Sequence, residues 1–81
     1  MVEQKKSLLC IKEYGKIELK LKEQLAKRQM TRGELARAIN ARFEVVNKWY
    51  SGQVERLDTD ILARMCFVLQ CEVQDLIKYK R

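Results

Sequence analysis

Histidine and proline are absent from this 81-residue chain, and only three glycines are present. Because proline and glycine disfavour helices most, their scarcity favours an all-helical (all-α) chain, as does the abundance of Leu, Lys, Glu, Arg and Ala. Without histidine, the two serines lack the expected base partner, and a zinc site loses its nitrogen ligand. There is no glycine-rich phosphate loop either, so we expect a protein that is not an enzyme.

Cysteine is scarce as well, with single residues at Cys10, Cys66 and Cys71. An odd number without a Cys-x-x-Cys pair argues against disulfides and zinc, so we expect buried thiols and neither a metal nor a cofactor. No apolar run approaches the length of a membrane span, and the cluster at 7–11 is shorter than the core of a secretory signal. These features predict a cytoplasmic protein with no membrane partner and no evident small-molecule substrate.

Basic residues outnumber acidic ones by 17 to 11, and the excess is unevenly placed. Residues 1–22 carry six basic and three acidic side chains, residues 27–56 carry seven and three, and residues 57–81 carry four of each. A basic surface confined to one part of a small domain is typical of proteins that bind a polyanion. The charge distribution therefore favours a nucleic acid as partner.

The stretch 30–52 has the pattern of two short helices joined by a tight turn. Thr31 and Glu34 form a capping-box pattern, in which the hydroxyl and the carboxylate each accept a hydrogen bond from a backbone amide at the helix start. Leu35 and Ile39 follow at helical spacing and predict a buried stripe. The first helix of the pair is therefore expected to begin just after Thr31.

The second half of this stretch has its own signals. Ala36 is small enough for two crossing helices to approach closely, and Asn40 can adopt the left-handed conformation that ends a helix. Val46 and Trp49 then share the inner face of a second helix, which Gly52 ends. The whole unit predicts a helix-turn-helix, which presents its second helix to the major groove of DNA.

The ordered spacing of these residues resembles the Xre/Cro-repressor-type helix-turn-helix family of transcriptional regulators. The matching residues are Glu34-Leu35-Ala36-Arg37, Ile39-Asn40, Val46, Trp49, Gly52, Leu62, Leu69 and Asp75-Leu76. The resemblance runs from about residue 21 to 77 and implies a five-helix, repressor-like bundle. Asn40 stands where the family usually has glycine, Arg42 replaces a small hydroxyl cap, and Phe43-Glu44 replace a polar or basic pair.

The rest of the chain completes the expected architecture. We expect helices at about 21–29, 32–39 and 43–50, a fourth helix capped by Asp58, and a short fifth helix from Cys71 or Glu72. Gly15–Leu21 alternates apolar and charged residues, which predicts a short strand. The segment before it is either the other strand of a hairpin or a helix over 3–13. We divide the chain into an N-terminal arm, 1–20, and a helix-turn-helix domain, 21–78.

The resemblance also implies which residues meet DNA. The groove-facing positions at the start of the second motif helix are Phe43, Glu44, Asn47 and Lys48. Phe43 can contact a thymine methyl, and Glu44 can accept from cytosine, although it can equally be an ordinary solvated residue. Asn47 can bond adenine, and Lys48 can donate to guanine or phosphate. Phosphate contacts are implied for Arg32, Arg42, Arg56, Ser51 and Gln53, together with free amides near Gly52.

Three aromatic residues allow more than one interpretation. Trp49 shares a face with Val46, so we expect it in the core rather than stacked on bases. Tyr50 lies on the outer side of the same helix and either bonds a phosphate or covers Lys and Arg stems. Phe67 points away from the inner stripe of its helix, which makes it a candidate for a subunit interface.

These observations predict a sequence-specific double-stranded DNA-binding protein, a transcriptional regulator and repressor of bacterial, phage or mobile-element origin. A homodimer is expected, held by the arm, by Phe67 or by the C-terminal tail. The alternative is a protein-interaction module, such as an antitoxin or an anti-repressor, that uses Phe43, Tyr50 and Phe67 as contacts.

Overall fold

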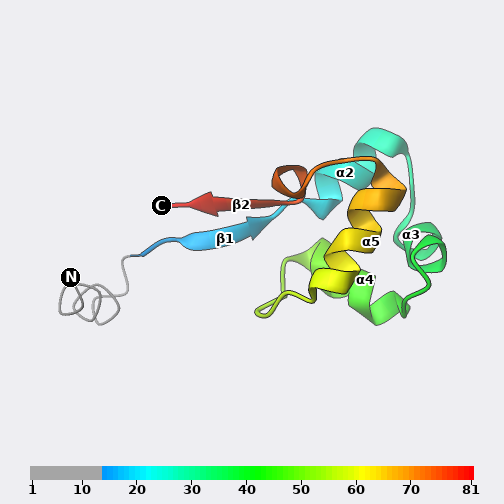
Figure 1. The fold of residues 1–81 in the computed structure, drawn as a ribbon, viewed down its shortest axis with the longest axis horizontal. Helices are drawn as coiled ribbons and strands as arrows, with labels where there is room; N and C mark the ends of the chain where they lie inside the picture. Colours follow the sequence, from blue (N-terminus) through cyan, green and yellow to red (C-terminus); the bar gives the residue numbers. More distant parts are fainter. Residues whose placement is uncertain (1–13) are drawn as a thin grey trace.

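The computed structural model describes residues 14–81 and shows a small helical body from which two paired strands extend (Figure 1). Its elements are β1 (Lys16–Leu19), α2 (Leu21–Arg28), α3 (Arg32–Ala38), α4 (Phe43–Ser51), α5 (Thr59–Leu69), the 3-10 turn η1 (Val73–Asp75) and β2 (Ile77–Lys80). The four α-helices lie where the sequence predicts them. Both interpretations of the segment before Gly15, a hairpin strand or a helix, concern residues outside the described part of the chain.

The helix boundaries follow the local signals in the sequence. Thr31 Oγ1 accepts from the Glu34 amide at 3.1 Å, and Glu34 Oε1 accepts from the Thr31 amide at 2.8 Å, which confirms the capping box. Asp58 caps α5 by accepting from the amides of Asp60 and Ile61. Asn40 has a φ of 57°, so it adopts the left-handed conformation expected at the turn of the motif.

One hydrophobic core holds the four helices together. Its buried residues are Leu21, Leu25, Leu35, Ala36, Ile39, Val46, Trp49, Ile61, Leu62, Met65, Leu69 and Leu76. Burial of each larger side chain contributes about 1.5–3 kcal/mol. Trp49 is only 3% exposed, which confirms its prediction as a core residue.

The expected fifth helix is not found among the described residues. Instead, one 3-10 turn is followed by β2, and Val73, the first residue of that turn, is 45% exposed. The carbonyl of Leu76 accepts a hydrogen bond from the Lys20 amide at 2.7 Å, so this backbone pairs across the chain rather than along a helix. The alternation of Ile77 and Tyr79 with lysines is a strand pattern that explains the difference. The fold is mostly helical with a small sheet, not all-α.

The predicted strand that begins after Gly15 is confirmed as β1. Among the described residues it pairs with β2, the last strand. β1 and β2 pair in antiparallel fashion, with Lys16 opposite Lys80, Ile17 opposite Tyr79, Glu18 opposite Lys78 and Leu19 opposite Ile77. Gly15, with a φ of 84°, precedes β1 where a Cβ would clash with the Lys80 carbonyl oxygen. The pairing thus ties the predicted N-terminal arm to the residues that follow the helices.

At the turn that replaces the expected fifth helix, Leu76 is buried and Val73 is exposed, and this difference can be tested. Leu76→Ala removes a fully buried side chain and should lower the free energy of unfolding by about 2–5 kcal/mol. Val73→Ala, its matched control, removes a half-exposed side chain and should change that free energy by about 0.5 kcal/mol or less. Urea denaturation followed by circular dichroism measures both. Equal losses would mean that Val73 faces the core, as a fifth helix requires.

Candidate nucleic-acid interface

The inner face of α4 determines which of its residues face solvent. Val46 is fully buried and Trp49 nearly so, and α4 packs against α3 through this face. Val45 also packs against the core, so other residues in the first two turns of α4 form its solvent side. Phe43, 47% exposed, is accompanied there by exposed Glu44 and Lys48 and by half-buried Asn47. The structure thus brings the four predicted groove-facing residues together.

Arg32, the first residue of α3, connects the two helices of the motif. Its Nη1 donates to Asn47 Oδ1 at 2.7 Å, across 15 positions of the sequence. The guanidinium carbon also lies 4.6 Å from the ring centre of Tyr50 and 5.8 Å from that of Phe43. A cation held against aromatic faces is stabilised by about 0.5–1 kcal/mol at an exposed site. Arg32 is therefore held in place beside the outer face of α4.

Tyr50 belongs to the group of side chains around Arg32, together with Phe43 and Asn47. The sequence alone left the role of Tyr50 open. Lys22 Nζ lies 5.8 Å from its ring centre, so the half-buried ring has basic groups from both α2 and α3 near it. A signal for this was present, because Phe43, Asn47 and Tyr50 follow the i, i+4, i+7 spacing of one helical stripe. Tyr50 thus has the charged groups of Lys22 and Arg32 beside its ring.

The C-terminal end of α4 differs from expectation. Gly52 and Gln53 donate their backbone amides to the carbonyls of Trp49 and Lys48, at 3.3 and 2.9 Å, so these amides are not free. The left-handed conformation of Gly52 turns the chain back onto the last turn of α4, where these amides bond the helix carbonyls. The prediction of free amides near Gly52 was therefore wrong. The Ser51 hydroxyl likewise donates to the Asn47 carbonyl at 2.9 Å. The side chain of Gln53 remains exposed.

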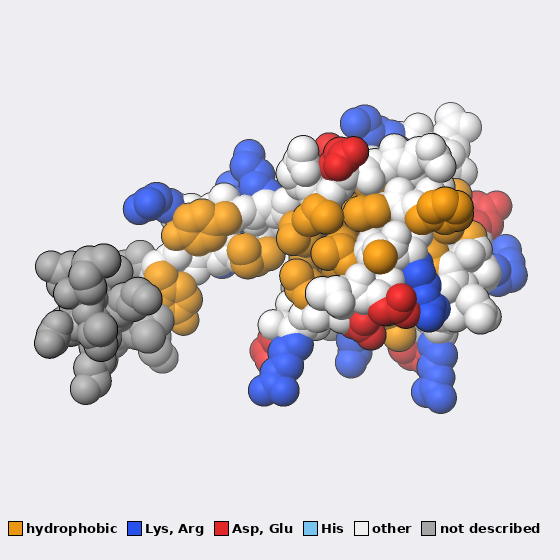
Figure 2. All heavy atoms as spheres, in the orientation of Figure 1, with side chains coloured by type: hydrophobic (Ala, Val, Ile, Leu, Met, Phe, Trp, Pro, Cys, Tyr) orange, Lys and Arg blue, Asp and Glu red, His pale blue; other side chains and the backbone are white. Residues whose placement is uncertain are grey.

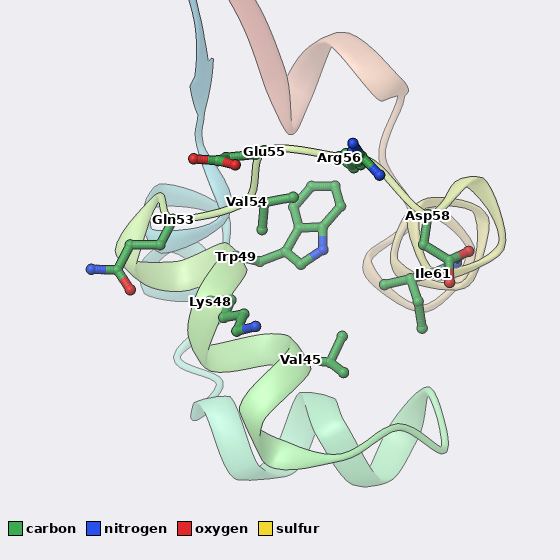
Figure 3. A pocket seen from close by; sticks show the side chains of 9 residues that line it. All are labelled: Val45, Lys48, Trp49, Gln53, Val54, Glu55, Arg56, Asp58 and Ile61. Carbon is green, nitrogen blue, oxygen red and sulfur yellow. Dashed lines mark hydrogen bonds between the residues drawn. The ribbon is translucent and has the colours of Figure 1, made fainter.

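A hollow of about 460 Å³ lies beside this end of α4 (Figure 3). Trp49 and Val54 form one wall, and Asp58 and Ile61 lie across from them. The remaining lining residues are Val45, Lys48, Gln53, Glu55 and Arg56. Because both basic and acidic side chains line it, the hollow is not suited specifically to an anion or to a cation. Gln53 and Arg56, two predicted phosphate contacts, line the hollow together with Lys48.

Arg42 and Arg56 extend the basic side of the motif. Arg42 is the residue at the N-terminal cap of α4, and its side chain makes no capping hydrogen bond. Both arginines are exposed, so their guanidinium groups are accessible to an anion. The positive end of the α4 dipole lies at the same place and adds to the attraction for phosphate.

Other chemistry is sparse in residues 14–81. Burial raises the pKa of the Cys71 thiol above its usual value, and the neighbouring Cys66 adds to this effect, so the reactive thiolate is disfavoured. Within this range no three metal-ligating side chains come together. No helix in the same range has the length and apolar character that crossing a membrane requires.

Comparison with known proteins shows the family of this chain and a solved structure with a similar fold. A family model described as a Cro/C1-type helix-turn-helix DNA-binding domain matches residues 20–81. Among solved structures, the chain is similar to a candidate DNA-binding protein from Bacteroides fragilis, with a TM-score of 0.69 and 22% sequence identity. That match covers 78% of this chain and 100% of the other, and at this identity it concerns the fold. A search of curated proteins found no significant match.

Proposed function

Because the chain belongs to the Cro/C1-type helix-turn-helix DNA-binding family, we propose that it reads specific double-stranded DNA sequences as a homodimer and represses transcription. It would do so by occupying an operator in a bacterium, a phage or a mobile element. The basic excess over the arm and the motif supports a polyanionic partner. We place the activity inside the cell and expect no catalytic step in it.

The observation that carries this proposal is the exposed stripe of α4 with Arg32 held beside it. Asn47 and Lys48 present hydrogen-bonding groups that can discriminate bases in the major groove. Glu44 accepts only, so cytosine is its natural base, and exposed Phe43 can contact a thymine methyl. The phosphate contacts we propose are Arg32, Arg42, Ser51 and Gln53.

A second candidate function rests on Phe67. Its side chain is 78% exposed on α5, beside a shallow hollow that Ala63, Val68 and the end of α3 help to line. A protein-interaction module, such as an antitoxin or an anti-repressor, would use such an aromatic residue as an anchor. A mobility-shift assay on random duplex DNA separates the two functions, because the interaction module has no reason to bind DNA.

The salt dependence of DNA affinity tests the phosphate contacts. The logarithm of affinity should fall linearly with the logarithm of salt concentration, by about 0.9 per phosphate contacted. Arg32→Ala should weaken binding to all sequences and reduce this slope by about one per subunit. Lys27→Ala removes the same charge from the last turn of α2, outside the proposed interface, and serves as the control. An unchanged slope in Arg32→Ala would exclude Arg32 from the interface.

Base discrimination tests the outer face of α4. Asn47→Ala and Lys48→Ala should each cost about 1–3 kcal/mol on the preferred site and relax the choice of base at one position. Glu44→Gln should behave differently: it removes a charge that DNA repels, so non-specific affinity should rise while discrimination falls. Selection from random duplexes, followed by affinity measurements, gives both quantities. If all three variants keep the wild-type ratio of specific to non-specific affinity, α4 does not read the sequence.

A further inference from the structure

The two-stranded ribbon of β1 and β2 has one apolar and one charged face. Ile17, Leu19, Ile77 and Tyr79 alternate with charged residues, so these four side chains share a face. Leu19 and Ile77 pack on the core, whereas Ile17 and Tyr79 are 56% and 53% exposed. Figure 2 shows hydrophobic side chains continuing from the helical body out along the ribbon. The apolar side chains of Ile17 and Tyr79 are therefore left exposed to solvent in a single subunit.

The outer edge of β1 has backbone groups that no other described strand pairs. Lys20 donates its amide toward β2, to the Leu76 carbonyl. Because successive residues of a strand direct their amides and carbonyls to opposite edges, Ile17 directs both of its groups away from β2. An exposed edge of this kind is a template for another strand.

The charges beside Ile17 make this edge complementary to itself. If two copies of β1 pair in antiparallel fashion with Ile17 opposite Ile17, Lys16 of each copy lies opposite Glu18 of the other. A shift of the symmetry centre by one residue would place two lysines or two glutamates together. The edge of β2 cannot pair in this way, because Lys78 and Lys80 would face lysines of the second copy.

We infer that the partner of the β1 edge is the β1 strand of a second copy of this chain, in the register centred on Ile17. The result is a four-stranded sheet in the order β2-β1-β1-β2, with two Lys16–Glu18 pairs between subunits. Its two-fold symmetry keeps both apolar faces on one side, so the exposed Ile17 and Tyr79 side chains form one surface. This inference rests on the proposed homodimer and adds the surface and register through which it forms.

Charge reversal with mixing tests this register in the full chain without DNA. Lys16→Glu places carboxylates opposite carboxylates, and Glu18→Lys places ammonium groups opposite each other. Each variant alone should dimerise roughly 10- to 100-fold more weakly than the wild type. An equimolar mixture of the two variants should dimerise at least as well as the wild type, because each pair between unlike subunits is then oppositely charged. Sedimentation equilibrium measures all three samples.

Lys78→Glu is the matched control, since it places like charges opposite each other inside one ribbon, against Glu18, and leaves the pairs between subunits unchanged. Its dimerisation should equal that of the wild type. A wild-type chain that stays monomeric, a mixture as weak as its components, or a control as weak as Glu18→Lys would each overturn the inference. If such a monomeric chain still binds DNA, only the β1 interface fails, and the proposed DNA binding stands.

Discussion

The burial of Val46 and Trp49 in the core is the constraint on which the rest of this domain depends. A chain of 81 residues has a small core, so each large buried side chain carries a substantial part of its stability. Because both residues lie on one face of α4, their burial fixes the rotation of that helix about its own axis. Phe43, Glu44 and Lys48 are exposed as a direct consequence, and the candidate interface follows from the core.

Arg32 gives this interface an ordered geometry before any ligand is present. Its hydrogen bond to Asn47 and its position over Tyr50 restrict the long Arg32 side chain, which binding would otherwise have to order at a cost of about 0.5–1.5 kcal/mol. The side-chain Oδ1 of Asn47 has two lone pairs, so it can accept from Arg32 and still accept from a base. Arg32 therefore positions Asn47, the residue that we propose to read a base, in addition to its own proposed contact with phosphate.

The sequence predicted most features that local chemistry determines. The capping box at Thr31, the cap at Asp58 and the left-handed Asn40 each depend on a few neighbouring residues, and all three are confirmed. The contact between Arg32 and Asn47 joins positions 15 residues apart, so no local pattern gives it. β2 was missed because its alternation is only four residues long and its partner, β1, lies at the other end of the described chain.

The most direct test of the central claim is a nuclear magnetic resonance titration of the labelled chain with duplex DNA at low salt. The account predicts that the largest shift changes occur at amides 42–48 and at the side chains of Arg32 and Asn47. Added salt should reverse them, because phosphate contacts are weakened by counterions. Changes concentrated around Phe67 on α5, with α4 unaffected, would contradict the claim that the outer face of α4 is the DNA-binding surface.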